Sequence, residues 1–185
     1  MMSLRSVLRG LQPAALLFAA LPSAHATANY VYHEQTANNP GCDPATAFMS
    51  PLDPVGGEAV TIRFKVEYQY WTSRLALYYT TDGSSPTGSY GTPSGTTKVL
   101  TSSPAAGVAY ECTFSSGSNT VDVAKAIIPA LPYGTTVKYI VSAWHDGGGV
   151  EVFANGPGPD CNCGEPTDTA AEATVFQYTV GKGLV

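Results

Sequence analysis

The sequence predicts an all-β protein whose antiparallel strands form a sandwich of about seven to nine strands. Short runs in which apolar and polar residues alternate recur along the chain, and Gly, Pro, Ser and Asn separate them. The 185 residues include 19 glycines and 14 prolines, which favour turns over long helices. We find no convincing amphipathic helix in the sequence, so a helical or α/β fold is not expected.

The clearest strand is the segment VTIRFKVEYQYW at 60–71, where every second residue is apolar or aromatic. Before it, NYVYHEQ at 29–35 is expected to be a leading strand, followed by a long loop that ends near Val55. The inward face of 60–71 comprises Ile62, Phe64, Val66, Tyr68 and Tyr70. This pattern is typical of a strand with one buried face.

The remaining strands follow at short intervals. In RLALYYT at 74–80 the residues Leu75, Leu77 and Tyr79 share the inward face, and Asp82-Gly83 forms the turn. The segment TVDVAKAIIPAL at 120–131 is β-branched and contains Pro129, which favours an edge strand. Further strands are expected at 96–101, 107–114, 135–144, 150–156 and 173–180, with Val137, Tyr139, Val141 and Ala143 facing inward in 135–144.

The first 26 residues have the pattern of a secretory signal peptide. Arg5 and Arg9 precede a short apolar run, and Ala24 and Ala26 have the spacing of a cleavage site. We therefore expect export to the periplasm or the exterior, and one domain at 27–185 with a loop segment at 27–57 and a core sandwich at 58–180. Removal of the two arginines lowers the basic count from 9 to 7 and the formal charge from −5 to −7. No basic cluster and no second apolar run are present, which disfavours nucleic-acid partners and a membrane span.

The four cysteines predict two disulfides in an exported chain. Cys161 and Cys163 are separated by one residue, so a bond between them would be strained. Cys42 and Cys112 are each expected to pair with one of them, and the spacing does not say which.

Two motifs resemble known extracellular families. The segment IPALPYGTTVKYIVSAW resembles a late sheet corner of fibronectin-III-like and related immunoglobulin-like modules through the residues Leu131, Pro132, Gly134, Thr135, Val137, Tyr139, Val141 and Ala143. It departs from the fibronectin-III pattern at Val137, where those modules often carry a tyrosine. The segment YYTTDGSSPT resembles the signature of chitobiase-type accessory modules of extracellular glycoside hydrolases. Together the resemblances cover about 58–154 and imply an immunoglobulin-like sandwich with an accessory rather than a catalytic role.

Catalytic and metal sites have weaker support in the sequence. A Ser-His-Asp arrangement could use His145 and Asp146, but GTPSG is not a nucleophile elbow. Asp82, Asp146, Glu151 and Asp160 lie in or beside turns, where calcium ligands occur, although Asp-Gly is also a common hairpin turn. A third hypothesis is a copper-dependent protein similar to polysaccharide monooxygenases, which would need cleavage after Ala24, so that His25 became the amino terminus and His33 or His145 the second ligand. We expect no cofactor.

The aromatic residues favour a binding role. Eleven tyrosines and two tryptophans occur in a chain with 12% charged residues, and aromatic rings stack on the apolar faces of sugars. The leading hypothesis is a secreted, non-catalytic module that binds a polysaccharide or a cell-surface glycan. Its stacking candidates are Trp71, Tyr78, Tyr90 and Trp144, and its polar candidates are Asp82 and Asp146. Whether Tyr78 and Tyr90 face solvent decides between a binding platform and a structural corner. The alternative hypothesis is a self-assembling subunit of an extracellular appendage or surface layer.

Overall fold

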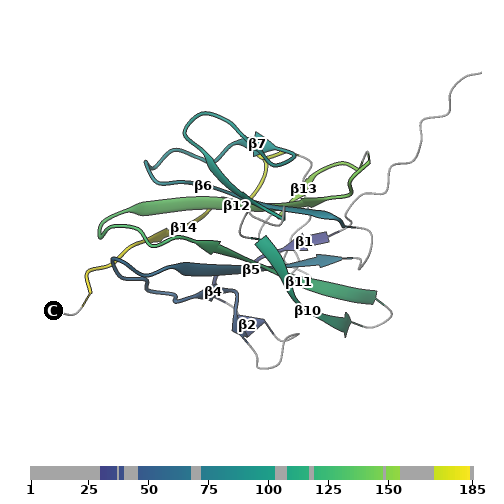
Figure 1. Ribbon diagram of the computed structural model, residues 1–185, viewed down its shortest axis with the longest axis horizontal. Coiled ribbons are helices and arrows are strands. Elements are labelled where there is room, and N and C mark those ends of the chain that lie inside the picture. The colour runs from purple at the N-terminus through teal and green to yellow at the C-terminus, as the bar shows by residue number, and fades with distance from the viewer. Residues whose placement is uncertain are drawn as a thin grey trace, which may run out of the picture.

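Two five-stranded antiparallel sheets face each other in the computed structural model (Figure 1). The structure describes residues 30–36, 38–39, 46–67, 72–102, 108–116, 119–147, 149–154 and 169–183. None of these residues is helical, and neither sheet closes into a barrel. The all-β prediction is therefore confirmed, and the two layers are consistent with a sandwich. In this part of the chain no helix could cross a membrane.

The first sheet has the strand order β1-β5-β11-β10, and β4 pairs with β5 beside β1. These strands are β1 (Tyr30–Tyr32), β4 (Met49–Ser50), β5 (Val60–Glu67), β10 (Val108–Ser116) and β11 (Asn119–Ile128). Ile62, Phe64 and Val66 are fully buried, as the alternation predicts. The expectation of an edge strand at 120–131 is wrong, because β11 lies between β5 and β10. Pro129 follows the last paired residue, so its missing N–H interrupts no hydrogen bond of the sheet.

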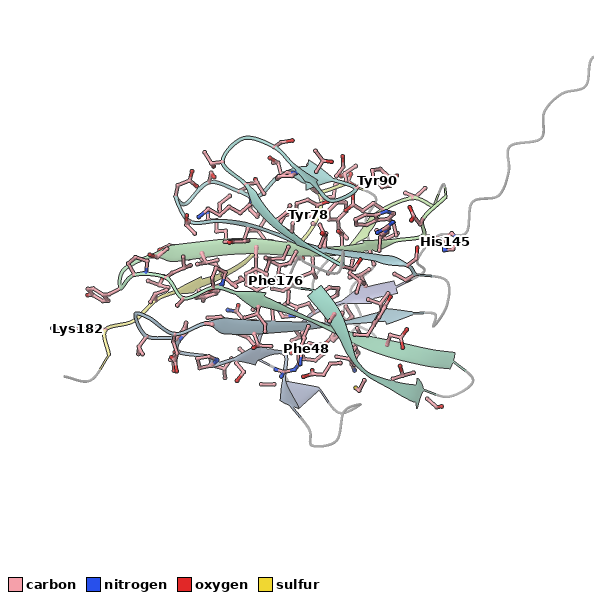
Figure 2. All side chains as sticks on the ribbon, in the orientation of Figure 1. Phe48, Tyr78, Tyr90, His145, Phe176 and Lys182 are labelled. Atoms are coloured by element: carbon pink, nitrogen blue, oxygen red, sulfur yellow. The ribbon has the colours of Figure 1, made fainter. Side chains whose placement is uncertain are left out.

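The second sheet has the order β13-β12-β6-β9, and β14 pairs with β12 beside β13. Its strands are β6 (Arg74–Thr80), β9 (Lys98–Thr101), β12 (Thr136–Trp144), β13 (Val152–Phe153) and β14 (Phe176–Thr179). The predicted inward residues of both long strands belong to the main core, where they meet those of β5. They are Leu75, Leu77, Tyr79, Val137, Tyr139, Val141 and Ala143. Figure 2 shows Phe176 between the two layers and Tyr78 on the other side of the second sheet.

The outer face of the second sheet is also buried, which the alternation of one apolar face does not predict. A second apolar cluster there comprises Ala76, Tyr78, Ile140, Trp144, Phe153 and Ala173. The chain between β6 and β9 folds over this cluster and contains the short hairpin of β7 (Gly88–Ser89) and β8 (Thr92–Pro93) (Figure 1). A methyl group at Gly88 would lie 2.6 Å from Cε1 of Tyr78, so the hairpin packs too closely for any side chain at this position. A further short hairpin joins β2 (Asn38–Asn39) to β3 (Thr46–Ala47).

His33 is buried against the main core. Its Nδ1 lies 2.6 Å from the carbonyl oxygen of Arg63, so Nδ1 carries the proton and donates it. Nε2 therefore accepts a hydrogen bond from the Tyr139 hydroxyl at 2.8 Å. The rings of Phe48, Tyr139 and Phe176 meet the imidazole edge-on. Desolvation by burial lowers the pKa of His33 from 6.5 to about 4, against the opposing effect of the Arg63 carbonyl.

The buried neutral His33 predicts a loss of stability in acid. Below pH 6.5 the unfolded chain binds a proton that the folded chain takes up only near pH 4, so stability falls as the pH drops through this window. The neutral state of His33 contributes about 3 kcal/mol to the free energy of unfolding at pH 7. Between pH 7 and pH 4 the free energy of unfolding, measured with urea, should therefore decrease by about 3 kcal/mol less in His33→Gln than in the wild type. A fall in His33→Gln as large as that of the wild type would contradict the assignment.

Candidate functional site

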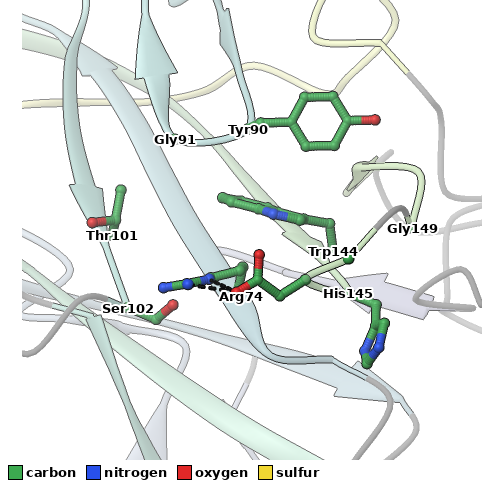
Figure 3. Close-up of a pocket in the computed structure, with 10 residues that line it drawn as sticks. Arg74, Tyr90, Gly91, Thr101, Ser102, Trp144, His145 and Gly149 are labelled. Atoms are coloured by element: carbon green, nitrogen blue, oxygen red, sulfur yellow. Dashed lines mark hydrogen bonds and ion pairs between the residues drawn. The ribbon is translucent and has the colours of Figure 1, made fainter.

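An open pocket of about 620 Å³ lies at the end of the second sheet where β12 finishes and β6 begins (Figure 3). The antiparallel register explains why it forms there, since Trp144 pairs with Arg74 and Thr101 pairs with Ala76. The β7–β8 turn supplies the remaining wall through Tyr90 and Gly91. The lining residues are Arg74, Tyr90, Gly91, Thr101, Ser102, Trp144, His145, Asp146, Gly147 and Gly149.

Tyr90 presents an aromatic ring at the mouth of this pocket. The residue is 53% exposed, and its backbone has a φ of 48° at the tip of the hairpin. No other non-glycine residue in the described part of the chain has a positive φ. The ring meets that of Trp144 at a centroid distance of 5.8 Å and an angle of 83° (Figure 3). Tyr90 is thus a stacking candidate that faces solvent.

Trp144 forms the inner wall of the pocket. Its side chain points away from Val141 and Ala143, as predicted, but the residue is only 8% exposed because the outer face is covered. A methyl group at Gly91 would be in van der Waals contact with Cη2 of the indole at 3.5 Å, so the hairpin turn lies about one methyl group away from the ring. Trp144 offers a ligand a limited apolar surface beside the Tyr90 ring.

An ion pair adds hydrogen-bonding groups to the aromatic corner. Arg74 donates to Oδ2 of Asp146 from Nε at 3.0 Å and from Nη2 at 2.5 Å. The two side chains are 43% and 59% exposed, respectively. The backbone N–H of Asp146 donates to Oγ of Ser73 at 2.7 Å, which fixes the turn after β12. Asp146 therefore joins Trp144 and Tyr90 in one pocket, whereas Arg74 was not a candidate from the sequence.

Two predicted binding residues do not belong to this pocket. Tyr78 is fully buried beneath the hairpin, so it is not a stacking residue. Asp82 lies at the opposite end of the sheet, because Thr80 pairs with Lys138 while Arg74 pairs with Trp144. The carboxylate of Asp82 accepts hydrogen bonds from its own turn, and the Ser84 hydroxyl is the main cause that lowers its pKa to about 2.

The structure says little about the last stacking candidate, Trp71, and about the four cysteines. Trp71 and the cysteines Cys42, Cys161 and Cys163 lie outside the described residues. Cys112 is half-buried on β10, next to a bulge that interrupts the predicted alternation of Val108, Tyr110 and Cys112. The predicted disulfides therefore stay a prediction.

The histidine and acidic residues considered above as metal ligands do not form a cluster within the described part of the chain. In the described ranges no group of three or more His, Cys, Asp or Glu side chains could hold a metal ion. Both ring nitrogens of His33 are hydrogen-bonded inside the protein, so His33 presents neither to a metal. His145 lines the pocket, and the other copper candidate, His25, lies outside the described residues.

A buried carboxylate fixes the hairpin that carries Tyr90. Glu151 is 2% exposed, and its Oε1 accepts hydrogen bonds from the hydroxyls of Tyr78 at 2.8 Å and Ser142 at 2.7 Å. Its Oε2 accepts the backbone N–H of Tyr90, and the Tyr78 oxygen accepts the N–H of Gly91 at 2.7 Å. Burial raises the pKa of Glu151, and the three hydrogen bonds oppose this shift. In the sequence, Glu151 is only one of four acidic residues in or beside turns, because nothing local indicates that its face of the sheet is covered.

The comparisons with known proteins give no family for this chain. No family model matches the sequence, and no curated protein matches it. The functional argument therefore depends on the geometry of the pocket.

The Glu151 network predicts a marked loss of stability in Glu151→Gln. The amide NH₂ would face a hydroxyl or an N–H that itself donates, so at least one buried donor would lose its acceptor. The expected decrease in the free energy of unfolding is about 1–3 kcal/mol, measured by urea unfolding at pH 7. Glu172→Gln removes the same charge at an exposed position and should change stability by less than about 0.5 kcal/mol. Equal stability of both variants would contradict the role assigned to Glu151.

Proposed function

We propose that this protein is an exported, non-catalytic module that binds a carbohydrate in the pocket beside Trp144. The observation that carries the proposal is the exposed ring of Tyr90 next to the indole of Trp144, with the Arg74–Asp146 pair in the same pocket. Sugars have apolar C–H faces that stack on aromatic rings and hydroxyls that need charged or amide partners. The proposal includes an immunoglobulin-like sandwich topology, two disulfides and removal of residues 1–26 as a signal peptide.

The polar groups of the pocket support binding better than catalysis. A serine-hydrolase triad would need the Asp146 carboxylate to orient a histidine, but this carboxylate accepts its hydrogen bonds from Arg74. The Ser102 hydroxyl accepts the N–H of Leu75 at 3.0 Å and keeps its own proton to donate to a ligand. The pocket volume of about 620 Å³ is within the usual range for small-ligand sites.

Self-assembly is a second candidate function, and one feature of the first sheet favours it. Strand β10 ends the strand order of that sheet, so within the described part of the chain it is paired on one side only. Such an edge can add a strand from another chain. Against this, β10 carries a bulge and Glu111, which bonds Arg63 and lies 3.5 Å from Lys125, and bulges and charges protect edges from pairing. Size-exclusion chromatography and electron microscopy distinguish the two, and a stable monomer would exclude assembly.

The carbohydrate proposal predicts that Tyr90→Gly loses affinity but keeps the fold. Glycine adopts the positive φ of this position freely and retains the backbone N–H that Glu151 accepts. The substitution therefore removes the ring and the long hydrogen bond, 3.4 Å, that its hydroxyl accepts from the N–H of Glu151. Affinity for a bound polysaccharide should fall about tenfold or more, measured by affinity electrophoresis or pull-down.

Tyr133→Ala is the matched control for this experiment. Tyr133 is 66% exposed and precedes β12, whereas Trp144 is the last residue of that strand. Its loss should leave the affinity unchanged. A folded Tyr90→Gly variant with wild-type affinity would show that the pocket is not the site, and a wild type that binds none of a broad glycan panel would overturn the function itself.

A further inference from the structure

We infer that the pocket selects a neutral, soluble sugar whose hydroxyl groups bind the Arg74–Asp146 pair, rather than an acidic sugar or a crystalline polysaccharide. The inference rests on the proposed function and specifies its ligand class. Three properties of the pocket carry it: the open positions of the ion pair, its internal charge balance, and the angle between the two aromatic rings.

The ion pair leaves one donor group and one acceptor atom available to a ligand. Both hydrogen bonds from Arg74 converge on Oδ2 of Asp146. Among the described residues, no hydrogen bond reaches Oδ1 of Asp146 or leaves Nη1 of Arg74. A hydroxyl group both donates and accepts, so sugar hydroxyls satisfy a carboxylate oxygen and a guanidinium N–H at the same time. The hydroxyl of Ser102, in the same pocket, adds a further donor.

The charge of the pocket disfavours an acidic ligand. Among the described residues that line the pocket, Arg74 is the only lysine or arginine, and Asp146 already neutralises its charge. The carboxylate of an acidic sugar would have to displace Asp146 from Arg74 or lie beside Asp146, and two adjacent negative charges repel each other. The chain as a whole carries a formal charge of −5, which adds to the repulsion.

The ring geometry disfavours a flat crystalline surface. A crystalline polysaccharide presents a plane of sugar faces and needs rings that lie in one plane. The rings of Tyr90 and Trp144 stand at 83° to each other, and Trp144 is 8% exposed (Figure 3). The two rings therefore form a corner, which suits a single soluble chain.

The test measures the affinity of the full chain for three kinds of probe by isothermal titration and pull-down. The neutral probes are the hexasaccharides of cellulose, amylose and mannan, the acidic probe is hexagalacturonate, and the crystalline probe is microcrystalline cellulose. The wild type should bind at least one neutral hexasaccharide. It should bind hexagalacturonate and microcrystalline cellulose at least tenfold more weakly than that hexasaccharide. Asp146→Asn frees the charge of Arg74, so affinity for the neutral sugar should fall about tenfold while affinity for hexagalacturonate rises. Asp82→Asn makes the same charge change at the opposite end of the sheet and should alter neither affinity.

The failure of this inference can be told apart from the failure of the proposed function. Preferred binding of hexagalacturonate or of microcrystalline cellulose, weakened by Tyr90→Gly, would overturn the inference and leave a carbohydrate-binding function in place. Unchanged affinity of Asp146→Asn for the neutral sugar would also overturn it. A wild type that binds no probe of any kind, and no glycan of a wider array, would overturn both.

Discussion

The buried carboxylate of Glu151 is the interaction on which the candidate site depends. Burial of an unpaired carboxylate at 2% exposure would lower the stability of the fold by several kcal/mol, so the oxygens of Glu151 require hydrogen-bond donors. The donors come from three separate parts of the fold: Tyr78 on β6, Ser142 on β12 and the backbone of Tyr90 in the hairpin. All three reach the carboxylate only when the hairpin lies on the outer face of the second sheet. The same contact covers Tyr78, places Gly91 over the indole of Trp144, and raises Tyr90 to the mouth of the pocket.

Alternation predicted the inward faces of the long strands because it reports directly which residues share a face. Ile62 and Phe64 on β5, and Val141 on β12, lie in the main core as expected. Alternation says nothing about what covers the opposite face, and here a segment that follows β6 covers it. Tyr78 and Ile140 are therefore buried in the second cluster although they alternate with the inward residues. Only the inward face of β6 was predicted, although its segment LALYY has no charged or amide residue at the alternate positions, which is typical of a strand buried on both faces.

The site was predictable where its residues are neighbours in sequence and unpredictable where pairing brings them together. Trp144 is the last residue of β12 and Asp146 lies in the turn that follows it, so the outward position of Trp144 follows from parity and that of Asp146 from the turn. Arg74 enters the pocket because the antiparallel register sets it opposite Trp144, and no single-sequence signal fixes that register. The same register separates Asp82 from Asp146, although both belong to Asp-Gly turns that look alike in the sequence.

The backbone of Tyr90 explains why a single exposed ring can act as a binding element. A tyrosine at a φ of 48° adopts a conformation that costs about 1 kcal/mol or more relative to extended backbone. The conformation persists because the N–H of Tyr90 bonds Glu151 and the N–H of the next residue, Gly91, bonds the hydroxyl of Tyr78. Two consecutive backbone donors are thus anchored in the interior while the side chain between them remains in solvent. A ring on so constrained a backbone loses little conformational freedom when a ligand stacks on it, which lowers the entropic cost of binding. The rigidity of the site therefore originates in a buried acid that is not among the residues lining the pocket.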